Sequence, residues 1–185
     1  MVWAIAFVVL LILGGIIIYN GLVKLRVRSD SAWADIDVQL KRRHDLIPNL
    51  VETVKGYAGH ERTTFERVTE ARTRAIAAGG PASRAHAEGQ LTEALKSLFA
   101  VAENYPLLRA SENFTQLQTQ ISEVEDQIQL ARRYYNAVVR DLNIRIQQFP
   151  SNFVAEMFGF RTREFFEAST PDRESPEVQF QAPGA

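Results

Sequence analysis

The sequence predicts an all-α protein: an N-terminal transmembrane helix followed by an elongated antiparallel helical bundle of three long helices plus a short fourth. Three observations support this fold class: an uncharged apolar run at the N-terminus, apolar residues that then recur every three or four positions, and interruptions of that pattern near proline and glycine. We expect residues 1–22 to form a transmembrane anchor, residues 23–168 a helical-bundle domain, and residues 169–185 a disordered tail with little apolar surface to bury.

The N-terminal apolar run is long enough to cross a bilayer. Residues Val2–Tyr19 carry no charged side chain, and a helix of this length approaches the roughly 30 Å of a hydrocarbon core. Trp3 and Tyr19 lie near its ends, where amphipathic rings favour the membrane interface. The alternative is a cleaved signal peptide, but no basic residue precedes the run and Tyr19-Asn20-Gly21 is a poor cleavage site.

The charges beside this run predict its direction in the membrane. Lys24, Arg26 and Arg28 follow the run, whereas only the α-amino group precedes it. Because the cytoplasmic flanks of membrane spans are enriched in lysine and arginine, we expect a single-pass protein with its N-terminus outside and its C-terminal domain in the cytoplasm. The residues expected to flank the span are Trp3, Tyr19, Lys24, Arg26 and Arg28.

The first helix of the bundle is expected from Ser31 to about Ala78, ending at Gly-Gly-Pro at 79–81. Its apolar stripe has helical spacing, with Arg43 occupying one position of the stripe. The apolar members are Trp33, Ile36, Leu40, Ile47, Leu50, Val54 and Tyr57. This stripe can continue the helix of the anchor, which would make the span the base of a rigid rod. Pro48 predicts a kink in the preceding turn.

Two further long helices complete the predicted bundle. Ser83 is the expected N-cap of the second, which ends before Pro106 and has a stripe of Leu91, Leu95, Leu98, Ala102 and Tyr105. The third begins after Ser111 or Asn113 and ends at Pro150. Its apolar seam repeats every 3.5 residues or so over about five heptads, as in a coiled coil. The seam consists of Phe114, Leu117, Ile121, Val124, Ile128, Ala131, Tyr135, Val138, Leu142 and Phe149.

A short fourth helix is expected after Ser151 or Asn152 as N-cap, with Gly159 just past its end. Its apolar face consists of Phe153, Val154, Met157 and Phe158. The third helix, about 60 Å long, exceeds the second, about 35 Å long. Part of the apolar seam is therefore expected to lie uncovered in a monomer, and a large uncovered apolar surface indicates a protein partner or self-association.

Residues 32–62 carry the highest density of polar side chains, but their spacing argues against a catalytic or metal site. Asp35 and Asp37 are two positions apart and cannot share a helix face. His44 and His60 would lie about 24 Å apart along one helix, too far to bind one ion. The sequence contains no nucleophile motif, phosphate-binding loop or dinucleotide fingerprint. We therefore expect a non-enzymatic protein with no catalytic residue, no metal and no cofactor.

Lys41, Arg42 and Arg43 form a basic cluster close to the expected membrane surface. Such a cluster can contact anionic lipids or the acidic groups of a partner. It can equally form a solvated helix face whose charges pair with neighbouring carboxylates. The candidate partner- or lipid-binding residues are Asp35, Asp37, Lys41, Arg42, Arg43, His44, Asp45 and Tyr57.

The overall composition excludes several functional classes. The net charge is −1, which gives no electrostatic reason to expect nucleic acid as a partner. The absence of cysteine excludes disulfides, thiolate catalysis and cysteine-ligated zinc.

Several long blocks of the chain resemble the LemA family of bacterial membrane proteins. In order, they are YNGLVKLR at 19–26, AWADIDVQLKRRHDLIPNLVETVKGYAGHE at 32–61, LTEALKSLFAVAENYPLLRASENF at 91–114, EDQIQLARRYYNAVVRDLN at 125–143 and FPSNFVAEMFGF at 149–160. The resemblance implies one N-terminal transmembrane helix in the bacterial inner (cytoplasmic) membrane, an outward N-terminus and a helical-bundle domain. It carries over no catalytic residue, and it links the chain with membrane organisation and with membrane proteases.

The sequence thus predicts a membrane-anchored, non-enzymatic helical scaffold or adaptor that acts through protein–protein contacts. Its expected partners are the lipid bilayer and either a second copy of the chain, in a homo-oligomer, or another membrane protein such as a membrane protease. The alternative is a membrane-surface protein that binds lipid or organises the membrane through Lys24–Arg28 and Lys41–Arg43.

Overall fold

The computed structural model describes residues 1–167, which are helical apart from short connections and a final non-helical segment. The helices are α1 (Val2–Lys55), α2 (Arg62–Ala77), α3 (Pro81–Glu103), α4 (Pro106–Arg109), α5 (Glu112–Gln147) and α6 (Ser151–Met157). The predicted all-α fold with an N-terminal apolar helix is confirmed. The tail that was expected to be disordered, residues 169–185, lies outside the described residues.

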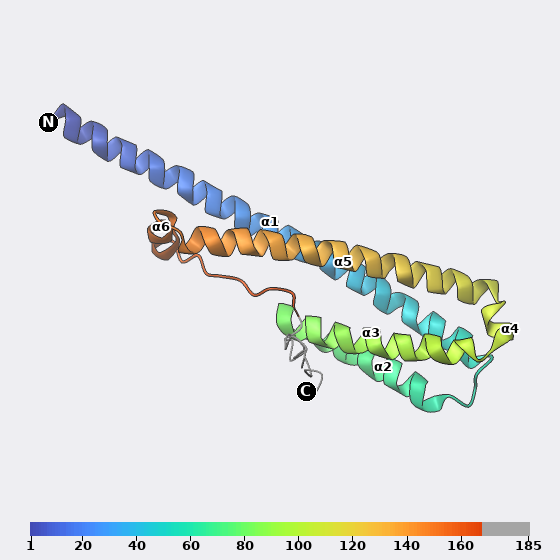
Figure 1. Cartoon of the computed structure of the whole chain (residues 1–185). Coiled ribbons are helices and arrows are strands. Elements are labelled where there is room, and N and C mark those ends of the chain that lie inside the picture. The colour runs from blue at the N-terminus through green and yellow to red at the C-terminus, as the bar shows by residue number, and fades with distance from the viewer. Residues whose placement is uncertain (168–185) are drawn as a thin grey trace, which may run out of the picture.

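The helix α1 contains both the apolar N-terminal run and the first helix of the bundle in 54 continuous residues. The run from Val2 to Tyr19 contains no buried residue, and it is long and apolar enough to cross a membrane. The helix continues through Pro48, whose missing N–H does not end it. The apolar run therefore projects from the bundle as part of the same helix that builds it (Figure 1).

A turn at residues 56–61 divides the helix that was predicted to extend to Ala78. Gly56 and Gly59 lie in this turn, and glycine disfavours a helix because it loses the most backbone entropy there. Ala58 between them is buried in the core, and α2 then runs back along α1 (Figure 1). Within residues 1–167 the bundle therefore has four long helices, α1, α2, α3 and α5, where the sequence predicted three.

The N-cap of α3 is Gly80, which corrects the prediction of Ser83. Gly80 has a φ of 79°, a conformation that glycine adopts without strain. Pro81 then occupies the first turn, where its missing N–H needs no partner. Two other predicted ends are confirmed, because Ser111 precedes α5 and Gly159, with a φ of 69°, follows α6. The prediction of Ser151 or Asn152 as the N-cap of α6 is wrong, because Pro150 is the N-cap and Ser151 is already helical.

The heptad seam of α5 is covered within the monomer, so the expectation of an uncovered seam is wrong. α5 packs antiparallel to α1 (Figure 1), and the α2–α3 hairpin completes the core at the end of the bundle far from the N-terminus. Of the predicted seam only Phe149 is exposed. The buried seam residues are Phe114, Ile121, Val124, Ile128, Tyr135, Val138 and Leu142.

After α6, residues 158–167 return along α5 as a non-helical segment that we call the strap. The Asn143 side chain donates to the Arg163 carbonyl at 2.9 Å and accepts from the Arg163 N–H at 2.8 Å. Asn136 makes the same pair of hydrogen bonds with Phe166, at 3.3 and 2.8 Å. Because these backbone groups have partners and the Phe166 ring is buried between α1 and α5, the strap is part of the folded domain.

Candidate functional site

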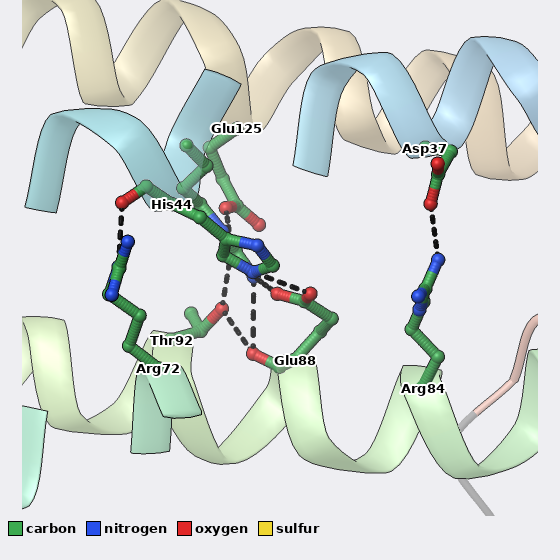
Figure 2. Close-up of polar contacts among 8 residues, drawn as sticks. Asp37, His44, Arg72, Arg84, Glu88, Thr92 and Glu125 are labelled. Carbon is green, nitrogen blue, oxygen red and sulfur yellow. Dashed lines mark hydrogen bonds and ion pairs between the residues drawn. The ribbon is translucent and has the colours of Figure 1, made fainter. Parts of the chain in front are cut away.

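A buried ionic cluster joins α1 to α3 and α5 inside the bundle (Figure 2). Arg43 of α1 is 1 % exposed, and its guanidinium pairs with the carboxylates of Glu88 on α3 and Glu125 on α5. The guanidinium also donates to the Thr92 hydroxyl at 3.1 Å. The His44 Nε2 atom lies 2.9 Å from the Glu88 carboxylate. We call these five residues the Arg43 cluster.

The charges of the Arg43 cluster compensate one another. Burial by itself would raise the pKa of the Glu88 carboxyl, but the hydrogen bond from His44 and the positive charge of Arg43 outweigh that effect, so the pKa of Glu88 is lowered. Glu88 is therefore ionised near neutral pH and forms a charge pair with Arg43 in which both side chains are buried. Removal of Arg43 would leave the buried Glu88 carboxylate without its cation, and removal of Glu88 would leave Arg43 with Glu125 as its remaining counter-charge.

Beside the Arg43 cluster, α1, α2 and α3 enclose a groove with a volume of about 320 Å³. Arg84 of α3 pairs with Asp37 of α1 at one end of it. Arg72 of α2 donates through Nε to the His44 carbonyl at 2.8 Å (Figure 2). We call this feature the α1–α2–α3 groove, and it is lined by Asp37, Leu40, Lys41, His44, Asp45, Arg72, Ile76 and Arg84. It presents charges of both signs around two aliphatic side chains.

The groove brings together four of the predicted partner- or lipid-binding residues, namely Asp37, Lys41, His44 and Asp45. These positions are three or four residues apart, or adjacent, so one side of α1 presents them. The other exposed candidates lie on α1 or just after it, outside the lining of the groove, and they are Asp35, Arg42 and Tyr57.

The prediction that Arg43 belongs to a binding surface is corrected by its burial, whereas His44 still lines the groove although most of its side chain is buried. Both side chains lie in the Arg43 cluster and are buried. The basic surface that remains at this level of α1 consists of Lys41 and Arg42, which are exposed. A partner can therefore meet two of the three cations of the predicted basic cluster, Lys41 and Arg42.

Sequence reasoning missed Arg72, Arg84, Glu88 and Glu125, which come from helices distant in the chain. One signal for the glutamates was present, because Arg43 occupies a position of the apolar stripe of α1. A charge in such a position must be buried, and a buried charge requires a counter-charge from another helix. The two arginines of the groove carried no comparable signal in the sequence.

The residues expected to flank the membrane span have the exposure that such a position requires. Trp3 and Tyr19 are exposed on α1 at the two ends of the apolar run. Lys24, Arg26 and Arg28 are exposed on the same helix just after it. Their side chains are thus available to a membrane interface.

Most of the carboxylates of the site are already engaged with arginine side chains. Within residues 1–167, no group of three or more histidine, cysteine, aspartate or glutamate side chains is placed to hold a metal ion. The carboxylates of Glu88, Glu125 and Asp37 already accept hydrogen bonds from arginine. The groove can offer its exposed charges and aliphatic side chains to a partner with complementary groups.

The fold and the site define a class of protein in which an apolar helix, long enough to span a membrane, continues into a helical bundle with a charged groove. The sequence model of the LemA family matches residues 32–180. The chain belongs to the LemA family. The protein is therefore a membrane-associated member of that family, as the resemblance of the sequence blocks implied.

Similar curated proteins come from two groups of bacteria. The magnetosome proteins MamQ 2 and MamQ 1 of Paramagnetospirillum magneticum (strain AMB-1) are each 28 % identical over 175 residues, which covers 80 % of this chain and 64 % of theirs. Protein LemA of Metamycoplasma hominis is 27 % identical over 155 residues, covering 83 % of this chain and 71 % of that protein. The chain thus spans less than two thirds of the length of the MamQ proteins that it matches.

Proposed function

We propose that this protein is a membrane-anchored, non-enzymatic helical scaffold or adaptor that acts through protein–protein contacts. One observation carries the proposal: α1 is a single helix whose exposed apolar part suits a membrane and whose other part lines the α1–α2–α3 groove. A partner bound in the groove would be held at a fixed distance and orientation from the membrane.

The side chains of the groove favour a protein as its occupant. Ile76 is exposed and supplies apolar surface, and Leu40, which is buried, also lines the groove. Lys41 and Asp45 beside them are exposed charges of opposite sign. An apolar centre with a charged rim is the usual composition of a protein interface, in which the charges select the partner and speed its association.

The proposed partner is a second copy of this chain or another membrane protein, such as a membrane protease. Anchoring both partners in one bilayer would raise their effective concentration, so a small interface suffices for specific contact. The groove has charges of both signs, which suits a self-complementary contact as well as a different protein.

Site-specific photo-crosslinking in native membranes tests the proposal. A crosslinking residue at Lys41 is expected to give an adduct of defined mass, while the same residue at Lys96, exposed on α3 outside the groove, gives none. Asp45→Lys is expected to remove the adduct at position 41, because it reverses a charge of the groove. An absence of any adduct at position 41, or equal adducts at both positions, would contradict the proposal.

A second candidate function is the binding or organisation of membrane lipid, which the exposed Lys24, Arg26 and Arg28 beside the apolar run favour. In vesicles of mixed composition, the full chain is expected to enrich phosphatidylglycerol around itself at low salt. The enrichment should decrease as salt screens the cations, and also when all three are replaced by glutamine. Enrichment that persists in both conditions would exclude this mode of binding.

We also propose that the N-terminus lies outside the bacterial inner membrane and the bundle in the cytoplasm, because the cations follow the span. The chain lacks cysteine, so single cysteines report on topology. In intact cells, Val2→Cys is expected to react with a membrane-impermeant maleimide, and Leu107→Cys on α4 only after the cells are permeabilised. The reverse pattern would place the bundle outside.

A further inference from the structure

The helix α6 and its flanking residues leave an apolar face that the chain itself does not cover. Phe153 and Met157, four positions apart, are 61 % and 78 % exposed, and Phe149 and Phe158 beside them are 74 % and 57 % exposed. We call these four residues the α6 face. No other stretch of similar length in residues 20–167 has so many exposed large apolar side chains. Such a concentration of apolar surface indicates a binding partner or a membrane.

The position of α6 indicates which of these covers the face. α6 lies beside α1 at the end of the bundle from which the apolar run projects (Figure 1). The ring centroid of Tyr19 is 4.7 Å from that of Phe158 and 5.8 Å from that of Phe160. On its inner side, α6 packs Ala155 against a small core with Leu22 of α1. The α6 face is thus held at the level of Tyr19.

Tyr19 marks the depth at which the hydrocarbon core of a bilayer ends. The apolar run that Tyr19 closes is about 27 Å long at about 1.5 Å per residue, close to the roughly 30 Å of hydrocarbon. If Val2 lies near one surface of the core, Tyr19 lies near the other, and the α6 face lies at the same level. Its continuity with the membrane-spanning surface of α1 therefore favours lipid as its occupant.

A basic depression of about 260 Å³ adjoins α6. It is lined by Arg26, Leu142, Gly159, Phe160, Arg161, Thr162 and Arg163. Arg163 pairs with Asp30 at 2.6 Å, whereas Arg26 and Arg161 have no carboxylate partner within residues 1–167. An apolar face followed by arginines that pair with no carboxylate of residues 1–167 matches the order of acyl chains and phosphates across a membrane interface.

We propose that α6 is an interfacial helix whose apolar face enters the acyl–headgroup boundary of an anionic bilayer, while Arg26 and Arg161 contact the lipid phosphates. Amphipathic helices of this kind bury their apolar face about 5–10 Å into that boundary. The chain then meets the membrane at two points, the span of α1 and α6, which fixes the tilt and rotation of the bundle. The inference rests on α1 spanning the membrane and is independent of any partner in the α1–α2–α3 groove.

Depth-dependent fluorescence quenching tests the proposal on the full chain. The chain has no cysteine, so Met157→Cys, Val9→Cys and Leu107→Cys each accept one environment-sensitive dye in vesicles of phosphatidylglycerol and phosphatidylcholine. Position 9 lies in the apolar run, and position 107 is a matched control because Leu107 is 77 % exposed, like Met157, but lies at the opposite end of the bundle.

The dye at position 157 is expected to lose most of its emission to lipids spin-labelled near the headgroup, and less to lipids labelled in mid-chain. The dye at position 9 should show the opposite order, and the dye at position 107 should keep its emission with both. Arg161→Gln is expected to reduce the preference of the dye at position 157 for spin-labelled phosphatidylglycerol over phosphatidylcholine. An unchanged preference would overturn the contact between arginine and phosphate.

Three results separate the possible failures. If position 9 is quenched and position 157 behaves like position 107, the interfacial role of α6 is overturned and the span stands. If the emission at position 157 is blue-shifted but lipids do not quench it, a protein covers the α6 face and the proposal is again overturned. If position 9 is not quenched either, the membrane span itself fails, and with it the inference.

Discussion

Replacing Glu88 by glutamine is expected to destabilise the bundle much more than the same replacement of Glu125. Both carboxylates pair with the buried guanidinium of Arg43, but the Glu88 side chain is 6 % exposed and that of Glu125 31 %. Removing one partner of a buried pair costs about 3–5 kcal/mol. We expect the lower end, about 3 kcal/mol, for Glu88→Gln, because Arg43 keeps Glu125 and Thr92. Partial solvation limits the loss for Glu125→Gln to about 1 kcal/mol.

Urea unfolding of the full chain in detergent micelles, followed by circular dichroism, measures both free energies of unfolding. Glutamine keeps the size of the side chain and its ability to accept a hydrogen bond, so each variant removes mainly a charge. The expected difference between the variants, about 2 kcal/mol, changes the folding equilibrium by more than tenfold. Equal losses in the two variants, or a loss below about 1 kcal/mol for Glu88→Gln, would refute the argument from burial.

Three further measurements test other parts of the structure. Because the pKa of Glu88 is lowered in the folded chain, its contribution to stability is complete above the ordinary glutamate pKa of about 4.3 and is lost as the pH falls through and below that value. The stability advantage of the wild-type chain over Glu88→Gln should therefore shrink in acid, and a constant advantage across this range would contradict the assignment. Asn143→Ala removes two hydrogen bonds to the strap, so it should lower the free energy of unfolding by about 1–3 kcal/mol and speed tryptic cleavage of the strap. Asn113→Ala, at an exposed position of the same helix, should change neither the stability nor the cleavage rate. In the urea assay, Leu50→Ala in the core should lower the free energy of unfolding by about 2–5 kcal/mol. Leu107→Ala on the surface should lower it by no more than about 0.5 kcal/mol. Similar losses in the two variants would show that the core is misplaced.

The helices could be predicted from the sequence because their signals are local. Three-and-four spacing, an N-cap at Ser111 and the glycine after α6 involve residues a few positions apart. The break at Gly56 was missed because apolar residues recur at helical intervals on both sides of it, through Val54 and Val68. Whether the helix continues through Gly56 depends on how α2 packs against α3 and α1. The local spacing of apolar residues carries no information about that packing.

The Arg43 cluster could not be predicted in full because it depends on which helices meet. The position of Arg43 in an apolar stripe indicated a buried charge. However, Glu88 is 45 residues away in the chain and Glu125 is 82 residues away. Other carboxylates on the same helices, such as Glu93 and Asp126, are exposed. Only the register of α3 and α5 against α1 decides which carboxylates face the guanidinium.

The register of α1 against α3 and α5 also determines where the apolar run lies relative to the bundle. Sliding α1 by one turn, about 5.4 Å, would separate Arg43 from both carboxylates and leave buried charges unpaired. The apolar contacts oppose such a slide less strongly, because leucine, isoleucine and valine recur at each turn. The Arg43 cluster therefore sets the position of the anchor helix relative to the bundle. Lys41 of the groove lies on that same helix, about 33 Å beyond Tyr19, and the cluster sets which residues of α2 and α3, such as Arg72 and Arg84, complete the groove at that distance.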